Sequence, residues 1–269
     1  MKKKSNSQPV VHGMRVKKEH GQNFLRDDRV LHEISQSVKL NNANILEIGC
    51  GDGALTKTIL DHPVNKMLVY EIDPEWAEFV KNSLIDDRLV ILQENFLDAD
   101  LSLKLQDNKW TITANLPYHV TFPILRKFIT VIDSLEEGVI MVQEEVAQRL
   151  VAIYGRAYGY VSIYFQCFFD WKLLSKVGPA SFFPSPKVNS RLLYFIPKKK
   201  KFEIINEEAF WKFIKAAFSQ PRRMLRNCLA SFHYDVSNIE PELLALRAQQ
   251  IESAKLLEIW VKINLTNQL

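Results

Sequence analysis

Four consecutive residues, Asn115-Leu116-Pro117-Tyr118, bring together an amide side chain, a restrained backbone carbonyl and an aromatic ring. The Asn115 amide oxygen and the Leu116 carbonyl, which the following proline restrains, can accept hydrogen bonds from one amine. Two such acceptors would favour a pyramidal nitrogen whose lone pair can attack a methyl group. The Tyr118 ring offers a face on which a base can stack, a contact worth about 1–3 kcal/mol. The motif therefore predicts methylation of an exocyclic base amine such as that of adenine, and a plain proline turn is the alternative.

A glycine-rich segment, Gly49-Cys50-Gly51-Asp52-Gly53, lies between a short apolar run and a helical pattern. Alternating glycines allow a tight turn and close approach of the backbone to a ligand. Glu47 and Asp52 add negative charge, which would repel the phosphates that a Gly-x-Gly-x-x-Gly turn binds. The turn therefore favours a cationic ligand such as S-adenosylmethionine, and Glu71 can accept hydrogen bonds from its ribose hydroxyls. Another nucleotide cofactor, or a structural turn, is the alternative.

A third segment, Phe182-Phe183-Pro184-Ser185-Pro186-Lys187-Val188, carries two prolines that would stiffen an extended loop. Such a loop could hold Phe182 or Phe183 over an extruded base, with Lys187 near a phosphate. The alternative is a rigid surface loop whose aromatic residues are buried.

These motifs need a scaffold, and the hydrophobic pattern predicts one. Apolar runs predict strands over 44–48, 67–72, 89–92, 110–114, 138–142 and 191–196. Helical patterns cover 28–40, the residues after Gly53 up to Leu60, a segment that Asp73 and Pro74 start, and 144–152. Residues 158–169 fit either a strand or a helix. The alternation predicts an α/β fold with a parallel sheet between helices, and both motifs at the carboxyl edge of that sheet.

The pattern changes after the basic run Lys198–Lys201. Four helical segments follow without a strand between them, over 207–218, 222–232, 241–248 and 253–263. We therefore expect a basic flexible arm over 1–20, a Rossmann-like domain over 21–197 and a small helical domain over 202–269.

Composition narrows the classes of protein that the chain can be. Of its 269 residues, 47% are hydrophobic and 25% are charged, as in ordinary globular proteins. The chain contains no apolar run long enough to span a membrane, and its Lys-rich start lacks the apolar core of a secretory signal. Its 3 cysteines are widely spaced and offer no zinc motif. We expect a cytoplasmic protein that binds no metal.

The net charge of +4 is unevenly distributed along the sequence. One basic cluster opens the chain, and a second lies between residues 180 and 235. Because each phosphate contact releases counterions, two such clusters favour a polyanionic partner such as RNA, and a solvated tail and linker are the alternative. The clusters comprise Lys2, Lys3, Lys4, Arg15, Lys17 and Lys18, and Lys187, Arg191, Lys198, Lys199, Lys200, Lys201, Lys212, Lys215, Arg222, Arg223 and Arg226.

Taken in this order, the motifs resemble those of the KsgA-type family of ribosomal RNA adenine dimethyltransferases, from His20 to about Ile251. The resembling segments are Gln22–Leu25, Glu47–Thr56, Glu71–Asp73, Asn115–Tyr118, Met141–Leu150, the Phe-x-Pro-x-Pro-x-Val loop at 182–188, and Arg222–Asn227. The resemblance implies a Rossmann-like class I S-adenosylmethionine-dependent methyltransferase domain with a small C-terminal helical domain. It also implies transfer of two methyl groups to each of two adjacent adenines near the 3′ end of 16S rRNA in the small ribosomal subunit.

The resemblance implies roles for individual residues as well. Asn115 and the Leu116 carbonyl would orient the amine, and Tyr118 and Phe182 would bracket the base. The cofactor pocket would be lined by Asn23, Leu25, Gly49, Gly51, Glu71, Asn95 and Asn115. The basic residues expected to contact RNA are Lys187, Arg222, Arg223 and Arg226. We expect a monomer that acts on a much larger particle.

Three positions depart from the family pattern. Asn95 stands where the family usually has aspartate, and since an amide oxygen can still accept from the adenine amine of the cofactor, we expect weakened binding. His119 stands where asparagine is common. Pro221 interrupts the start of a basic helix and leaves the geometry of RNA contact there open.

Three other functions stay open at this point. The first is a large-subunit (23S) rRNA adenine methyltransferase of the antibiotic-resistance type, against which Leu116 and the Phe-x-Pro-x-Pro loop argue mildly. The second is a non-catalytic ribosome assembly or transcription factor, against which the intact glycine turn, Glu71 and Asn115 argue. The third is a DNA adenine methyltransferase, whose motif more usually reads Asp-Pro-Pro-Tyr.

Overall fold

The computed structural model describes residues 9–17, 20–105, 108–198, 204 and 206–266. The chain divides into two compact units, the first formed by residues up to Ala147 with 171–197, and the second by 148–170 with 198–269. The first unit ends at Pro197, where the sequence placed the end of the Rossmann-like domain, but residues 148–170 were expected in that domain and belong to the second unit. Residues 148–170 join the second unit because Tyr158 and Ile163 belong to its hydrophobic core. The basic residues Lys2, Lys3, Lys4, Lys18, Lys199, Lys200 and Lys201 lie outside the described residues.

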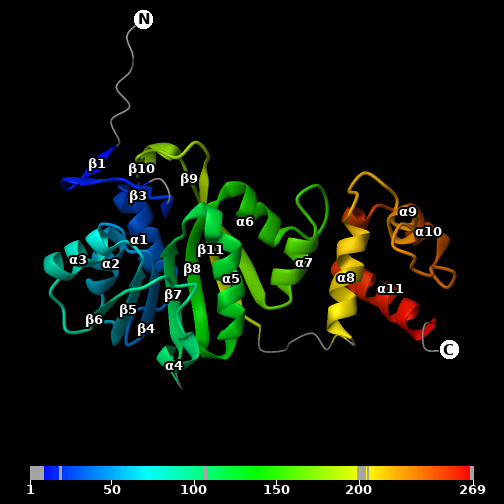
Figure 1. Ribbon diagram of the computed structural model, residues 1–269, viewed down its shortest axis with the longest axis horizontal. Helices are drawn as coiled ribbons and strands as arrows, with labels where there is room; N and C mark the ends of the chain where they lie inside the picture. Colours follow the sequence, from blue (N-terminus) through cyan, green and yellow to red (C-terminus); the bar gives the residue numbers. More distant parts are fainter. Residues whose placement is uncertain (1–8, 18–19, 106–107, 199–203, 205, 267–269) are drawn as a thin grey trace, which may run out of the picture. The chain divides into compact units, whose positions relative to one another are not determined.

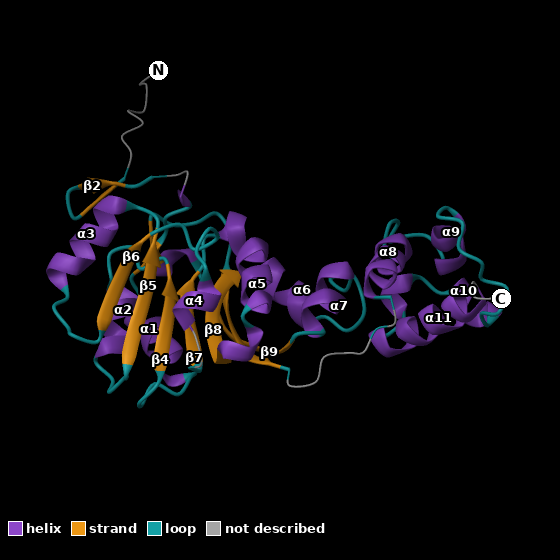
Figure 2. Cartoon of the chain, turned by 60° about the horizontal axis from the view of Figure 1, so that its bottom comes forward, coloured by secondary structure: helices purple, strands orange, loops and turns teal. Residues whose placement is uncertain are grey.

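A seven-stranded sheet forms the centre of the first unit (Figure 1). The neighbouring strands β6, β5, β4, β7 and β8 run parallel to one another, and β11 is antiparallel to β8. The order across the sheet is β6 (Leu89–Gln93), β5 (Lys66–Glu71), β4 (Asn44–Ile48), β7 (Trp110–Asn115), β8 (Leu135–Gln143), β11 (Ser190–Pro197) and β9 (Phe169–Val177). Figure 2 shows β6, β5, β4 and β7 side by side. The predicted α/β fold is confirmed, although the sheet is mixed rather than wholly parallel. The ambiguous region 158–169 forms the helix α7 (Tyr160–Gln166), and the strand β9 that follows it was not predicted.

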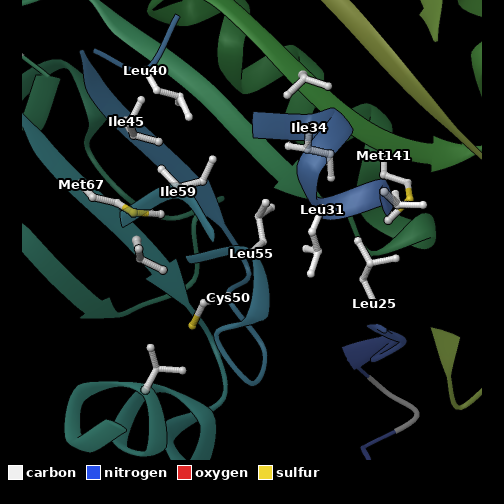
Figure 3. Packing of buried hydrophobic residues seen from close by; sticks show 14 of the residues in the cluster. Leu25, Leu31, Ile34, Leu40, Ile45, Cys50, Leu55, Ile59, Met67 and Met141 are labelled. Atoms are coloured by element: carbon white, nitrogen blue, oxygen red, sulfur yellow. The ribbon is translucent and has the colours of Figure 1, made fainter. Parts of the chain in front are cut away.

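Alternate residues of these strands pack against helices on opposite faces of the sheet. On one face, Ile45 and Met67 meet α1 (Asp28–Gln36), α2 (Ala54–Leu60) and α3 (Pro74–Ser83) in one apolar cluster (Figure 3). On the other face, an aromatic chain runs from Tyr70 through Phe96 and Phe128 to Phe195, with ring centroids 5.4, 5.9 and 5.9 Å apart. Phe128 belongs to α5 (Thr121–Thr130), and the shorter α4 (Leu101–Leu105) precedes β7. The sheet is therefore covered on both faces, as the uninterrupted apolar character of its strands requires.

Residues 9–17 are ordered, which corrects the expectation of a flexible arm over the whole of 1–20. Val10–Val11 (β1) pairs antiparallel with Met14–Arg15 (β2) across His12 and Gly13, whose φ angles are +48° and +81°. Two positive φ angles in a two-residue loop favour a tight hairpin. Val11 and Val16 then pack on Phe24 and Trp76, which anchors the segment to the first unit.

The second unit has a helical core of its own. Phe213, Ile214, Leu229 and Trp260 are among its buried residues. Its helices are α7 (Tyr160–Gln166), α8 (Glu207–Ala217), α9 (Leu225–Ala230), α10 (Pro241–Ala245) and α11 (Ser253–Thr266), and the chain enters the unit through α6 (Glu144–Val151). The predicted succession of helices after the basic run is confirmed.

Candidate active site

The two chemical motifs lie at the point where the strand order of the sheet reverses. β4 has β5 on one side and β7 on the other, and all three strands run parallel. Gly49 directly follows β4, and Asn115 is the last residue of β7. The glycine turn and the Asn115–Tyr118 motif therefore meet at the carboxyl edge of neighbouring strands, where open α/β sheets bind their ligands.

One cavity joins these motifs. Its lining includes nine of the residues predicted to bind the cofactor or the target amine: Asn23, Leu25, Gly49, Gly51, Glu71, Asn95, Asn115, Leu116 and Tyr118. Phe182 is not among the lining residues. Phe182 is 3% exposed and belongs to the apolar cluster that contains Ile45 and Met67, whereas the neighbouring Phe183 is 46% exposed. The expected bracket of Tyr118 and Phe182 around a base is therefore not formed in this structure, because β10 (Phe182–Phe183) pairs with β3 (Phe24–Leu25) and turns the Phe182 ring inward.

Hydrogen bonding joins the backbone of the glycine turn to the side chain of Glu71. Gly49 and Gly51 adopt φ angles of +75° and +54°, which side chains disfavour. The Glu71 carboxylate accepts hydrogen bonds from Gly51 N and Asp73 N, both at 2.9 Å. Burial raises the pKa of the Glu71 carboxyl even though these two N–H groups donate to it. Oε1 keeps one lone pair for a further donor, and Oε2 also accepts from Cys50 Sγ at 3.7 Å, a weak contact that a stronger hydroxyl donor can replace. Glu71 can therefore both hold the turn and accept from a ligand.

The negative charge at this turn is smaller than the sequence suggested. Burial raises the pKa of Glu47 to about 8, so most of this carboxyl is neutral at pH 7. Thr56 donates to its Oε2 at 2.7 Å, and its buried Oε1 has no hydrogen-bond partner among the described residues. Asp52 forms an ion pair with Arg26. A cation in the cavity would favour the ionised form of Glu47, so its charge would develop when a ligand binds.

Replacement of Glu47 by glutamine is expected to stabilise the cofactor-free protein increasingly as the pH rises. A folded-state pKa above the unfolded value means that the wild-type stability is fully present below the unfolded pKa of 4.5 and is lost towards about 8. Glutamine keeps an acceptor for Thr56 and does not titrate. Urea unfolding from pH 5 to 8 should show the variant gaining about 1.4 kcal/mol per pH unit over wild type. Stability curves that stay parallel would show that Glu47 is ionised in the folded protein.

The Asn115–Tyr118 motif is held rigidly. Asn115 Nδ2 donates to the backbone carbonyl of Asn23 at 3.0 Å, and Leu116 N donates to Met141 O at 3.1 Å. The Tyr118 hydroxyl and Ser190 Oγ lie 2.5 Å apart. Burial raises the pKa of Tyr118, so the hydroxyl stays protonated at neutral pH. These hydrogen bonds fix the position of the Asn115 amide oxygen and of the Tyr118 ring.

Two of the residues that depart from the family pattern, Asn95 and His119, line the cavity. Asn95 donates to Asp98 Oδ2 at 2.7 Å and accepts from Leu97 N at 3.1 Å, which fixes its amide at the cavity wall. The second lone pair of its oxygen is still able to accept. His119 lies against Gly21, where a Cβ would come within 3.2 Å of the His119 ring.

The residues expected to contact RNA are exposed in both units. Lys187 follows β10 in the first unit, and Arg222, Arg223 and Arg226 belong to the second. The predicted helix over 222–232 begins later than expected, at Leu225. Arg223 N donates to Gln220 O at 2.9 Å, which closes a turn with Pro221 at its second position, a place that proline favours.

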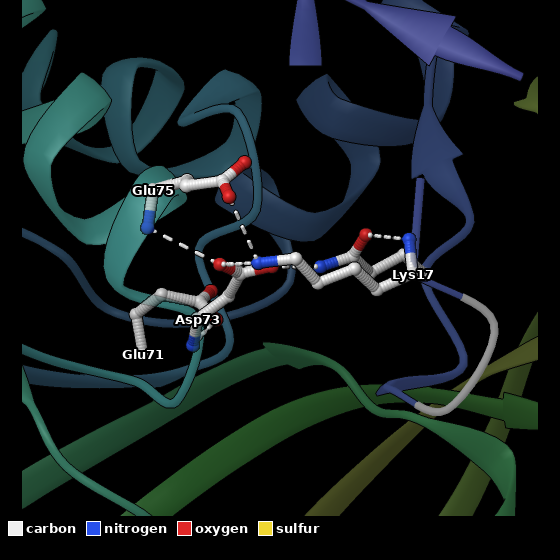
Figure 4. A network of polar contacts seen from close by, with 5 residues as sticks. Lys17, Glu71, Asp73 and Glu75 are labelled. Carbon is white, nitrogen blue, oxygen red and sulfur yellow. Dashed lines mark hydrogen bonds and ion pairs between the residues drawn. The ribbon is translucent and has the colours of Figure 1, made fainter. Parts of the chain in front are cut away.

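A polar network beside the cavity was missed by sequence reasoning. Asp73 was predicted only as the cap of α3, and its side chain does accept from Glu75 N at 3.1 Å. The same carboxylate also accepts from Lys17 Nζ at 2.7 Å and from Gln22 Nε2 at 2.8 Å (Figure 4). The short spacing between Glu71 and Asp73 is a sequence signal for a shared site. The contacts of Asp73 with the N-terminal segment join residues that are far apart in the sequence, and no local sequence pattern predicts such pairs.

Among the described residues, no group of His, Cys, Asp and Glu side chains could hold a metal ion. In the same part of the chain, no helix is long and apolar enough to cross a membrane.

Comparison with known proteins identifies the family. The model of the ribosomal RNA adenine dimethylase family matches residues 13–252. Ribosomal RNA small subunit methyltransferase A of Mycoplasmopsis pulmonis is 34% identical over 260 residues, covering 93% of this chain and 100% of the relative. The protein of the same name from Geobacter metallireducens is 37% identical over 224 residues, 81% of each chain.

Solved structures share the fold. A dimethyladenosine transferase from Plasmodium falciparum has a TM-score of 0.75 at 22% identity, covering 90% of this chain and 98% of that one. The 23S rRNA methyltransferase ErmE has a TM-score of 0.74 at 21% identity, covering 90% and 100%. Because the two TM-scores are nearly equal, the fold does not distinguish a dimethyladenosine transferase from a 23S rRNA methyltransferase.

The sheet order and the cavity at its reversal point define a class I methyltransferase. The chain belongs to the ribosomal RNA adenine dimethylase family. The predicted fold class and the predicted enzyme class are therefore both confirmed.

Proposed function

We propose that the protein dimethylates the exocyclic amines of two adjacent adenines near the 3′ end of 16S rRNA in the small ribosomal subunit, with S-adenosylmethionine as methyl donor. The observation that carries the proposal is the single cavity lined by the glycine turn, Glu71 and the Asn115–Tyr118 motif. The relatives at 34–37% identity are named for the small subunit, which favours this substrate over 23S rRNA. A ribosomal substrate would place the enzyme in the cytoplasm, and we expect it to act as a monomer.

The cavity fits S-adenosylmethionine on chemical grounds. Gly49 leaves open space where a side chain would stand, since a Cβ there would meet no atom within 4 Å. Glu71 can accept from ribose hydroxyls, and the unpaired Oε1 of Glu47 can accept from an ammonium group. When bound, the cofactor supplies an electrophilic methyl group on its sulfonium. Asn95 would meet its adenine amine, and Asn23 and Leu25 would close the pocket.

The residues of the motif would position the target amine rather than react covalently with it. Asn115 Oδ1 and the Leu116 carbonyl would each accept one N–H, which directs the nitrogen lone pair to the methyl group. The Tyr118 ring would stack on the base. A Phe182 contact with the base would require the 182–188 segment to move, so it stays a prediction. Exposed Lys187, Arg222, Arg223 and Arg226 would bind RNA phosphates.

The proposal predicts transfer of labelled methyl groups to small subunits from cells that lack this modification. Already dimethylated subunits should accept almost none, because both amines are substituted. Labelled RNA should be digested and the products separated to identify the modified base. Label in large-subunit RNA would favour the 23S alternative, and tight binding of small subunits without label would favour a non-catalytic assembly factor.

A further inference from the structure

The orientation of the Asn115 amide is set by a backbone group from a distant part of the chain. Asn115 Nδ2 donates to the carbonyl oxygen of Asn23 at 3.0 Å. A carbonyl oxygen only accepts hydrogen bonds, so the NH₂ group must face Asn23 and Oδ1 must face away from it. The proposed function, on which this inference rests, needs an oxygen rather than an NH₂ group opposite the target amine. A reversed amide would set donor against donor.

The position of the Asn23 carbonyl is fixed from both sides. On one side, β3 pairs with β10, with Leu25 opposite Phe182, and Arg26 N donates to Ser181 O at 2.8 Å. On the other side, Gln22 Nε2 donates to Asp73 Oδ2 at 2.8 Å. The segment between these two attachments is short, so a movement of Gln22 would be passed directly to Asn23.

Asp73 forms the second attachment. Its side chain is 0% exposed and accepts from Lys17 Nζ at 2.7 Å and from Gln22 (Figure 4). Gln22 Oε1 in turn accepts from Lys17 N at 2.8 Å, which closes a three-membered network. Asp73 N donates to Glu71 at 2.9 Å. A buried carboxylate needs such donors, so loss of Lys17 or Gln22 would leave it incompletely satisfied and loosen the N-terminal segment.

We infer that Lys17 and Gln22, bound to Asp73, are positioning residues for methyl transfer that fix the Asn23 carbonyl and thereby orient the Asn115 amide. Neither residue touches the reacting atoms in this arrangement. Gln22 also lines the cavity, and Asp73 N donates to Glu71, so a loss of cofactor affinity is a separate effect. With the cofactor saturating, their contribution to the rate passes through Asn115 and should disappear when the Asn115 amide is absent.

The test is a double-mutant cycle with full-length protein. Lys17→Met keeps the apolar stem and removes the charge, and Gln22→Met removes the other hydrogen bond without changing charge. Each should lower the single-turnover rate constant of methyl transfer to unmodified small subunits, at saturating S-adenosylmethionine, by about tenfold. In an Asn115→Ala background the same changes should lower the residual rate less than about twofold. Equal losses in the two backgrounds would overturn the inference.

Lys66→Met is the matched control, since Lys66 is an exposed lysine at the start of β5, at the opposite edge of the sheet from Glu71. It should leave the rate unchanged.

A second readout needs no RNA. The side-chain amide resonances of Asn115, identified in ¹⁵N-labelled protein by their absence in Asn115→Ala, should be protected from solvent exchange in wild type and in Lys66→Met. Lys17→Met and Gln22→Met should lose at least about tenfold of that protection. If the variants lose protection but the wild-type protein does not methylate small subunits, the proposed function is refuted, and the inferred orientation of the Asn115 amide by Lys17 and Gln22 is kept. Unchanged protection with normal wild-type activity would refute the inference alone.

Discussion

Replacement of Asn115 by alanine is expected to lower the rate constant of methyl transfer by about 10²–10³-fold, the usual cost of losing one preorganised hydrogen-bond partner of the transition state. The amide oxygen of Asn115 is the acceptor expected to favour a pyramidal amine nitrogen, and its amide nitrogen is already engaged by Asn23 at 3.0 Å. Cofactor binding should change little, because Glu71 and the glycine turn stay in place. Single-turnover transfer and calorimetric titration with S-adenosylmethionine measure the two quantities separately.

Asn44 provides the matched control for this substitution. Its Nδ2 also donates to a backbone carbonyl, that of Lys109 at 3.2 Å, but Asn44 begins β4 and so lies at the amino edge of the sheet. Asn44→Ala should therefore keep the wild-type transfer rate. An Asn115→Ala variant that is as active as Asn44→Ala would rule out the proposed orientation of the amine by Asn115.

The central sheet was predictable because local signals and burial agree there. The strand 44–48 was placed with its observed bounds, and Asp73-Pro74 gave the start of α3, since an aspartate cap and a first-turn proline act locally. The strand β9 was missed because Asp170, Lys172 and Lys176 give it the composition of a polar edge rather than an apolar run.

The N-terminal hairpin had a signal that was overlooked. Val10-Val11 and Met14-Arg15 flank His12-Gly13, which is the spacing of a two-residue hairpin loop. The neighbouring lysines suggested a solvated arm instead. Lys17 does not fit a solvated arm, since its ammonium group is bound to a carboxylate that is entirely buried.

Residue types were enough to propose a candidate site, but the protonation and side-chain directions there depend on long-range contacts. Sequence placed Glu47 and Asp52 at the turn as negative charges, whereas burial neutralises the first and Arg26 pairs with the second. The inward direction of the Phe182 ring likewise depends on strand pairing with Leu25, which no local pattern encodes. Protonation and ring direction follow from the folded surroundings, so only the three-dimensional structure could supply them.

Replacement of Glu71 by alanine is expected to raise the dissociation constant of S-adenosylmethionine by about 100-fold, because two hydrogen bonds from ribose hydroxyls to a charged acceptor would be lost. The free energy of unfolding should fall as well, since Gly51 N and Asp73 N would each lose their acceptor, at about 1–3 kcal/mol for a buried group. Calorimetric titration and urea unfolding measure the two effects on the same samples.

Two further variants separate ligand binding from support of the glycine turn. In Glu71→Gln, one side-chain atom still accepts from a backbone N–H while the NH₂ group opposes the other, so both effects should be intermediate. Glu78→Ala, an exposed carboxylate on α3, removes the same charge without touching the cavity and should change neither quantity. If Glu71→Ala lowered stability but bound the cofactor as wild type does, Glu71 would serve only to hold Gly51, and the ribose hydroxyls would need another acceptor on the cavity wall.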